Sequence, residues 1–250
     1  MKDKPRKSSL KNKLGCAVAS VGAVLGLAAL LLPMIFAARS GAKLNTCNNH
    51  LKQLGIALLN YESVYKSFPP AYVADADGKP MHSWRVLLLP FLERQDVYKK
   101  YDFNEPWNGP HNRQLAGEMD SVFRCPEATG DSQETSYVAV VGSDTGWPGA
   151  TPIKIRDMKD GPSKTIAIVE VAKSGINWME PRDLKLIEAM QGVTVPGHGP
   201  GLKISSNHAA GGANVGYFDA HVSFLPVGFS PEVLRGLLTA AGGEIIRVPD

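Results

Sequence analysis

The stretch from Gly15 to Ala38 reads GCAVASVGAVLGLAALLLPMIFAA and contains no charged residue. A second stretch, Cys47 to Tyr65 (CNNHLKQLGIALLNYESVY), follows it after a short basic joint. At about 1.5 Å of rise per residue, a helix of 24 residues spans roughly 36 Å, which is enough to cross a hydrocarbon core of about 30 Å with some tilt. The first stretch therefore predicts a transmembrane helix at residues 15–38.

A cleaved secretory signal is the main alternative to this anchor. Such signals have an apolar region of about 7 to 15 residues and small residues before the cut. The uncharged run is longer, and a cut after Ala38 would place Phe36 where a small residue is required. An uncleaved anchor is favoured.

The charges on either side of the run predict its orientation. Residues 1–14 carry one acidic residue, Asp3, and six basic ones, Lys2, Lys4, Arg6, Lys7, Lys11 and Lys13, whereas only Arg39 and Lys43 follow closely on the other side. The positive-inside bias predicts a cytoplasmic tail at 1–14 and an extracytoplasmic domain at 39–250. We expect a single-pass protein of the cell membrane, with membrane lipid as a partner.

The overall charge argues against a nucleic-acid-binding protein. The net charge of +3 comes from the basic tail, and the rest of the chain is slightly acidic. A nucleic-acid-binding face requires a cluster of basic residues. The 18 prolines and 25 glycines predict a loop-rich body with short strands.

Two of the three cysteines lie in the predicted outer domain. Cys16 falls within the predicted span, and Cys47 and Cys125 remain for the oxidising side of the membrane. We hypothesise a disulfide between them, which would stabilise the fold by about 4 kcal/mol through loop closure.

The second stretch predicts a helix with one apolar face. Spacings of three and four join Leu44, Cys47, Leu51, Leu54, Leu58, Tyr61 and Tyr65. Phe68-Pro69-Pro70 ends this helix, because a residue before proline is pushed out of the helical region. Since little interrupts the joint, the span and this helix can form one rod.

Downstream segments predict short strands and helices. Ser136–Val141 and Thr165–Val171 are typical of strands, and Asn214–Leu225 predicts a hairpin that turns at Asp219-Ala220. Helices are predicted at Arg182–Gln191 and after Ser230, where Gly242-Gly243 would end the second one. A last strand is predicted at residues 244–248.

Many segments, in one order, resemble a known bacterial family. They read LLLPMIFAAR, CNNHLKQLGIALLNY, FPPAY, SWRVLLLPFLE, EPWNGPHN, RCPE, ETSYVAVVG, NWMEPRDL, SNHAAGGANVGYFDAHVSFL and LTAAGGE. This set resembles the family called domain of unknown function 1559, whose members look like pilins or pseudopilins. The resemblance implies an α+β, pilin-like fold in which a long N-terminal helix, first in the membrane, packs on an antiparallel sheet with loop-rich insertions.

The chain departs from the family pattern at both ends. The membrane entrance, Lys11 to Cys16, lacks the glycine-aromatic junction and the glutamate of a prepilin processing site. The family's C-terminal motif has histidine, nine residues, then Asp-Gly, whereas His208 and Asp219 are separated by ten residues and Ala220 replaces the glycine.

Few residues suggest a chemical site. His208, Asp219 and His221 form the best candidate set for a metal, because zinc accepts histidine and carboxylate ligands. The structural alternative, a turn aspartate with loop and surface histidines, is favoured, so we predict no metal site and no cofactor. His198 is a flexible loop candidate.

Two further sets could bind or cleave sugars. Glu170, Glu180 and Asp183 could supply a glycosidase pair, although carboxylates that hold loops are commoner. Trp107, Trp147 and Trp178 could stack on sugar rings or be buried as pins of the loops, and burial is favoured. The weak binding candidates are therefore Trp107 and Trp178, together with His208, Asp219 and His221.

The sequence thus predicts a non-catalytic, pseudopilin-like component of a secretion or surface assembly. Its expected partners are copies of itself or other proteins, through the N-terminal helix. The alternative is an anchored module that binds a solute or carbohydrate, and a glycosidase-type enzyme is a distant third.

Overall fold

A computed structural model describes residues 8–196 and 201–243. The chain divides into two compact units, Met1–Ala42 and Lys43–Asp250, and each is considered by itself. The predicted strand at 244–248 and His198 lie outside the described residues, as do residues 1–7 of the predicted tail at 1–14.

The helix α1 (Ser8–Tyr65) runs without a break for 58 residues. It ends where Lys66 takes a positive φ of 60°, just before the Phe68-Pro69-Pro70 segment that predicted its end. Most side chains of the predicted span at 15–38 lie outside those that the structure describes. Among the described residues, no helix is both long and apolar enough to cross a membrane.

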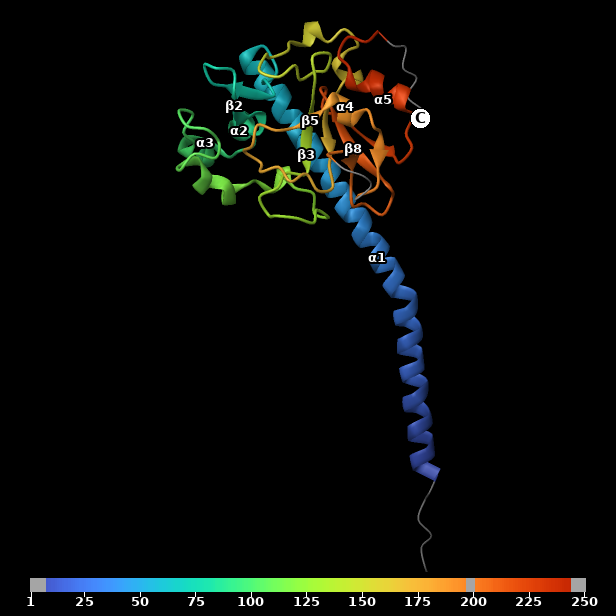
Figure 1. Cartoon of the computed structure of the whole chain (residues 1–250). Coiled ribbons are helices and arrows are strands. Elements are labelled where there is room, and N and C mark those ends of the chain that lie inside the picture. Colours follow the sequence, from blue (N-terminus) through green and yellow to red (C-terminus); the bar gives the residue numbers. More distant parts are fainter. Residues whose placement is uncertain (1–7, 197–200, 244–250) are drawn as a thin grey trace, which may run out of the picture. The chain divides into compact units, whose positions relative to one another are not determined.

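A five-stranded sheet organises the second unit (Figure 1). Its strand order is β5 (Leu184–Lys185), β3 (Tyr137–Val141), β4 (Ile166–Glu170), β8 (Gly212–Tyr217) and β9 (Val222–Pro226). Neighbouring strands from β3 to β9 are antiparallel, and only β5 pairs in parallel, with β3. The predicted α+β class and the antiparallel sheet are confirmed.

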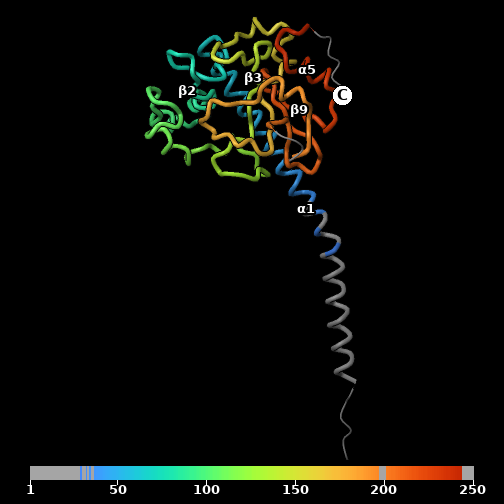
Figure 2. The backbone as a smooth tube through the Cα atoms, viewed as in Figure 1, coloured from blue at the N-terminus to red at the C-terminus, as the bar shows by residue number. Residues whose placement is uncertain are grey.

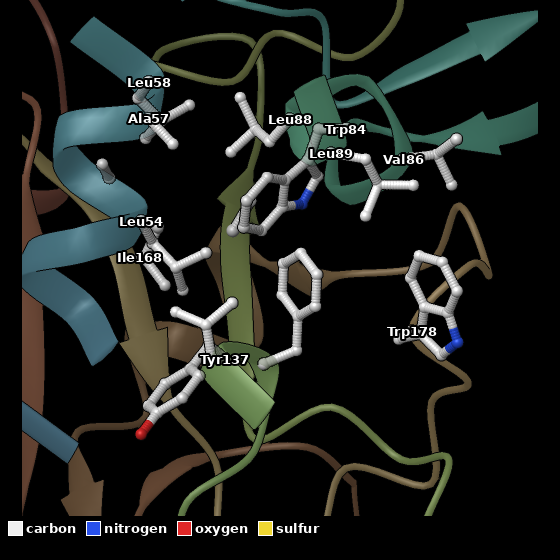
Figure 3. Close-up of a cluster of buried hydrophobic side chains, with 14 of the residues drawn as sticks. Leu54, Ala57, Leu58, Trp84, Val86, Leu88, Leu89, Tyr137, Ile168 and Trp178 are labelled. Carbon is white, nitrogen blue, oxygen red and sulfur yellow. The ribbon is translucent and has the colours of Figure 1, made fainter. Parts of the chain in front are cut away.

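Alternate residues of the strands face two hydrophobic cores. On β3, Tyr137 and Ala139 join a core with the buried face of α1, whereas Val138 and Val140 join a core with α5 (Pro231–Leu238). Figure 3 shows Leu54, Ala57 and Leu58 of α1 turned toward Trp84 and Leu88 in the first core. Residues 47–65 of α1 thus cover one face of the sheet, and α5 covers the other.

The α1 helix approaches the β8–β9 hairpin closely, although the two are far apart in sequence (Figure 2). A Cβ atom at Gly55 would lie 2.7 Å from the Cα of Ala220, so only glycine fits there. Ala220 has a φ of +69°, and the turn runs through three residues between Tyr217 and His221 rather than two. The predicted hairpin is confirmed, and in its longer turn Ala220 still takes the left-handed conformation that favours glycine.

Smaller elements surround the sheet. The remaining strands are β1 (Tyr72–Ala74), β2 (Pro80–Ser83), β6 (Val193–Thr194) and β7 (Ile204–Ser205). The remaining helices are α2 (Trp84–Leu88), α3 (Gln95–Lys100) and α4 (Leu186–Ala189), and the 3-10 helices are η1 (Leu89–Phe91), η2 (Asn112–Glu118), η3 (Ser121–Phe123), η4 (Ile155–Asp157) and η5 (Pro162–Lys164).

Two predicted helices differ from the structure. The helix predicted at Arg182–Gln191 is wrong at its start, because Leu184 and Lys185 extend to pair with β3 before α4 begins. The last helix begins after Ser230, whose side chain accepts from the Val233 amide, but it ends at Leu238, before Gly242-Gly243.

Candidate functional site

Segments from distant parts of the second unit bring sulfur, imidazole and carboxylate groups together at the end of β4. Cys47 comes from α1, Cys125 from the loop after η3, Glu170 from the last position of β4, and His208 from the loop between β7 and β8. All four side chains are buried, and one potential ligand atom of each lies within 4.8 Å of the others. We call these four residues the cysteine-histidine cluster.

Cys47 and Cys125 form a disulfide whose Cα atoms are 5.4 Å apart, the pairing expected from the sequence. The bond joins α1 to a loop 78 residues further along the chain. Cys47 is fully buried and Cys125 is 4% exposed. A crosslink across a loop of this length stabilises the fold by about 4 kcal/mol, because it limits the unfolded chain.

His208 lies between two carboxylates. Its Nδ1 is 2.7 Å from Glu127 Oε2, and its Nε2 is 3.1 Å from Glu170 Oε1 and 3.8 Å from Cys125 Sγ. Each ring nitrogen of His208 thus lies within hydrogen-bonding distance of a carboxylate oxygen. Burial lowers the pKa of His208, but the hydrogen bonds and charges of Glu170 and Glu127 outweigh burial and raise it.

Glu170 has no arginine or lysine partner among the described residues and is held by amides instead. Both the backbone N–H and the side-chain Nδ2 of Asn214 donate to Glu170 Oε2, at 3.1 and 3.0 Å. Oε1 is thereby left to His208. The strand pairing explains this placement, since Glu170 is flanked by Tyr137 on β3 and, one step beyond the Val169–Val215 pair, by Asn214 on β8.

Three buried polar atoms near this cluster have no hydrogen-bond partner among the described residues: His50 Nδ1, Tyr137 Oη and Asn214 Oδ1. His50 is one helical turn from Cys47, and its ring meets that of Tyr137 edge-on at 6.1 Å. Figure 3 shows the Tyr137 hydroxyl pointing away from Trp84 and Leu88. Burying an unpartnered polar atom costs about 1–3 kcal/mol, so the surroundings of the cluster differ from an apolar core.

One residue of the cluster, Cys125, also lines a groove. This groove has a volume of about 550 Å³ and is lined by Thr46, His50, Met119, Ser121, Arg124, Cys125, Pro126 and Ala128. Outside the buried residues, Lys43 Nζ lies 3.7 Å from Glu127 Oε1. Cys125 is thus the member of the cluster that lies beside this groove.

The structure does not bring together the weak candidate set of His208, Asp219 and His221, for which the sequence analysis favoured structural roles. His221 Nδ1 lies 2.5 Å from Asp219 Oδ1, and its ring stacks on Tyr217, on the exposed hairpin turn. In the described part of the chain, the one group of potential metal ligands contains His208 but neither of the other two. Proximity of His208 to the hairpin in sequence was misleading, because its loop turns toward β4.

Two of the three carboxylates considered for glycoside cleavage, Asp183 and Glu180, make ion pairs, and the third, Glu170, belongs to the cysteine-histidine cluster. Asp183 Oδ1 lies 2.5 Å from Arg85 Nη2 and accepts from the Ala139 amide, and Trp84 Nε1 also donates to Asp183. Burial raises the pKa of Asp183, and these contacts oppose the rise. Glu180 pairs with Arg182 at 2.6 Å.

The tryptophan side chains pack into the loops and the core and do not form an exposed surface on which a sugar ring could stack. Trp178 is fully buried, donates to the Ala116 carbonyl and stacks on Phe123. Trp147 is also fully buried and donates to the Ala167 carbonyl. Trp107 is half-buried and packs against the same core.

Sequence reasoning missed Glu127 and the role of Glu170. A signal for Glu127 was available, because the segment RCPE places a glutamate two residues after Cys125. The meeting of Glu127 with His208 depends on tertiary structure, since the two residues are 81 positions apart.

Comparison with known proteins gives one relationship. Residues 36–193 match the family described as protein of unknown function (DUF1559), labelled SBP_bac_10, which covers Cys47, Cys125 and Glu170 but not His208. Searches of curated proteins and of solved structures found no match. Since the match extends over more than half of the chain, the protein belongs to the DUF1559 family.

Proposed function

We propose that the protein is a non-catalytic, pseudopilin-like component of the cell envelope, anchored by one membrane span with its domain outside the cytoplasm. The observation that carries this proposal is the unbroken α1 helix. Its first part contains the uncharged residues 15–38, and its last part is built into the domain core through Cys47, Leu51 and Leu54. A helix with these two parts suits a protein that is anchored by one end and carries a domain on the other.

The disulfide supports a location outside the cytoplasm. Disulfides persist in oxidising compartments and are rare where thiols are kept reduced. The basic tail before the uncharged run favours the same orientation. Protease added to intact spheroplasts should therefore remove the domain and leave a short N-terminal fragment, and full protection of the domain would contradict the orientation.

The ion pairs of the carboxylates support a role without catalysis. Asp183 is bound by Arg85, and Glu180 is bound by Arg182, so neither is left free to protonate or attack a glycosidic bond. Folded protein incubated with labelled glycans should release no more product than heat-treated protein does. Turnover by the folded protein would contradict the proposed absence of catalysis.

Sideways association through the N-terminal helix is the proposed mode of assembly. A photo-crosslinking residue at Leu32, which is exposed on α1, should give a ladder of crosslinked species in intact membranes. The matched control is the same substitution at Ile187, an exposed aliphatic residue on the domain. The assembly would be contradicted if the Leu32 variant gave only monomer. It would also be contradicted if the Leu32 and Ile187 variants gave equal ladders of crosslinked species.

A second candidate, an anchored solute- or carbohydrate-binding module, is favoured by the partial exposure of Trp107 and, separately, by the groove beside Cys125, which Trp107 does not line. Trp107 is the aromatic candidate that retains some exposure, whereas Trp178 is in the core. Calorimetric titration with cell-wall oligosaccharides tests this function. Binding that Trp107→Ala abolishes without unfolding the domain would favour the module over the assembly component.

A further inference from the structure

We propose that the cysteine-histidine cluster is a redox-controlled zinc site. In the oxidised protein Cys47 and Cys125 are joined, and no thiolate is available to a metal. When the bond is reduced, both sulfurs, His208 Nε2 and Glu170 Oε1 become a set of four ligands for one Zn²⁺ ion. The proposal concerns the domain alone and does not depend on the membrane anchor.

The geometry of the four ligand atoms fits a closed tetrahedral site. They already lie within 4.8 Å of one another, although they come from four separate segments. With zinc about 2.3 Å from sulfur and about 2.0–2.1 Å from nitrogen or oxygen, ligand atoms of a tetrahedral site lie roughly 3.3–3.8 Å apart. Opening the disulfide moves the sulfurs in the required direction, and His208 Nε2 at 3.8 Å from Cys125 Sγ is at that separation.

Contacts around the ligands orient them as in a metal site. Glu127 Oε2 accepts from His208 Nδ1 at 2.7 Å, which leaves Nε2 facing Cys125 and Glu170. A carboxylate on the far nitrogen is the usual partner of a zinc-bound histidine, because it fixes the ring and the tautomer. Asn214 does the same for Glu170 by holding Oε2 and leaving Oε1 toward the cluster.

The unpartnered buried atoms point to a ligand at the same place. Tyr137 and Asn214 are both fully buried, and they flank Glu170 across the sheet. Tyr137 Oη and Asn214 Oδ1 have no partner among the described residues. Polar atoms therefore lie beside the four ligands, as expected at a metal site and not in an apolar core.

Two balanced steps connect the two forms. A dithiol gives two electrons and two protons to the Cys47–Cys125 bond, which becomes two thiols while the dithiol closes to its own disulfide. Zn²⁺ then displaces both thiol protons and the Nε2 proton of His208 to solvent. Two thiolates with one imidazole and one carboxylate favour zinc over the hard cations Mg²⁺ and Ca²⁺.

Metal titration of the full-length chain tests the proposal, with Cys16→Ser as background so that the only thiols are those of the cluster. The protein is reduced with a phosphine under nitrogen and titrated with Co²⁺ and then Zn²⁺. We expect one Co²⁺ per chain, with the intense visible bands of a tetrahedral site and sulfur-to-cobalt charge transfer, and displacement by one Zn²⁺. The oxidised protein should show neither signal.

Substitutions separate this site from adventitious binding by thiols. His208→Ala should weaken zinc binding at least 10-fold, and Glu127→Gln, which removes a positioning group, should weaken it about 10–100-fold. The matched control is His221→Ala, on the exposed hairpin turn, which should bind like the background protein. Circular dichroism of each reduced variant reports whether it is folded.

Three results would overturn the proposal. One is the absence of a cobalt band with sulfur character in the reduced background protein, folded or not. Another is equal zinc binding before and after reduction. The third is unchanged affinity in His208→Ala, which would mean that the two thiols bind zinc without the site.

Discussion

Two buried polar networks lie in the same domain and differ in how completely they are satisfied. In the first, Arg85 donates to Asp183, to the Tyr137 carbonyl and to Ser83 Oγ, and Asp183 also accepts from the Ala139 amide. In the second, His208 bridges Glu127 and Glu170, and the neighbouring Tyr137 Oη and Asn214 Oδ1 lack partners in the described part of the chain. The first network binds α2 to the sheet. The second contains buried polar atoms that could contact a ligand.

The difference separates a structural ion pair from a candidate site. A buried ion pair is retained without strain when each donor and acceptor is matched. A cluster with unpartnered buried atoms carries a cost in free energy, and such costs concentrate where a protein binds or reacts. We therefore expect the two networks to respond differently to substitution and to metal.

The largest effect is expected from breaking the satisfied network. Arg85→Met leaves the Asp183 carboxylate buried without its cation, which should lower the free energy of unfolding by about 3–5 kcal/mol. Urea denaturation followed by circular dichroism measures this change. Arg156→Met is the control, because its pair with Asp157 is exposed and should change stability by less than about 0.5 kcal/mol. A loss under about 1 kcal/mol for Arg85→Met would remove the contrast between the networks.

The disulfide should come next. Replacing both Cys47 and Cys125 by serine frees a long loop in the unfolded chain and should cost about 2–4 kcal/mol in the absence of metal. Urea denaturation in a chelating buffer measures the loss. Cys16→Ser serves as the control and should leave the midpoint unchanged. Equal midpoints for the double variant and the control would show that the crosslink contributes nothing.

Removing the bridging histidine should have a smaller effect. His208→Gln loses hydrogen bonds to two carboxylates and should cost the oxidised protein about 1–3 kcal/mol. Thermal unfolding of the variant is compared with that of His221→Gln, whose imidazole is half exposed. If the two variants melt together, the bridge by His208 is not a stabilising contact.

The smallest effect is a dependence on pH from a histidine outside both networks. His82 is buried, with Nδ1 2.9 Å from Tyr101 Oη and Nε2 3.1 Å from the Phe103 carbonyl. Burial lowers the pKa of His82, although the Phe103 carbonyl and Asp102 oppose this. The unfolded chain binds the proton more readily, so stability should fall as the pH falls through about 6.5 and level off below the folded-state pKa.

Comparison of variants isolates this contribution. Denaturation midpoints of His82→Gln should depend less on pH than those of the wild type. The comparison covers about pH 7.5 to 5, the range in which histidine titrates. His111→Gln, an exposed histidine, should keep the wild-type dependence. A steeper dependence in His82→Gln would mean that His82 is charged in the folded protein.

The sequence predicted those elements whose own residues carry the pattern. The buried face of α1 from Cys47 to Leu58, the strands β3 and β4 and the β8–β9 hairpin all follow hydrophobic periodicity. The strand β5 could not be predicted, because its two residues are held by parallel pairing with β3 rather than by their own preference.

The candidate site was predictable only in part. The pairing of Cys47 with Cys125 followed from elimination among three cysteines. The position of His208 between Glu127 and Glu170 did not, because each residue comes from a loop or strand end whose direction is set by tertiary packing. For the same reason the sequence could not show that His208 lies apart from Asp219 and His221, which meet each other on the hairpin turn.

Native mass spectrometry of the full-length protein tests the contrast between the two networks most directly. The chain is sprayed after exposure to zinc in its oxidised form and again after reduction. We predict that the oxidised chain carries the Cys47–Cys125 bond and no zinc, and that the reduced chain gains one zinc ion. A reduced chain without zinc, or one zinc ion in both forms, would contradict the assignment of the cysteine-histidine cluster as a site.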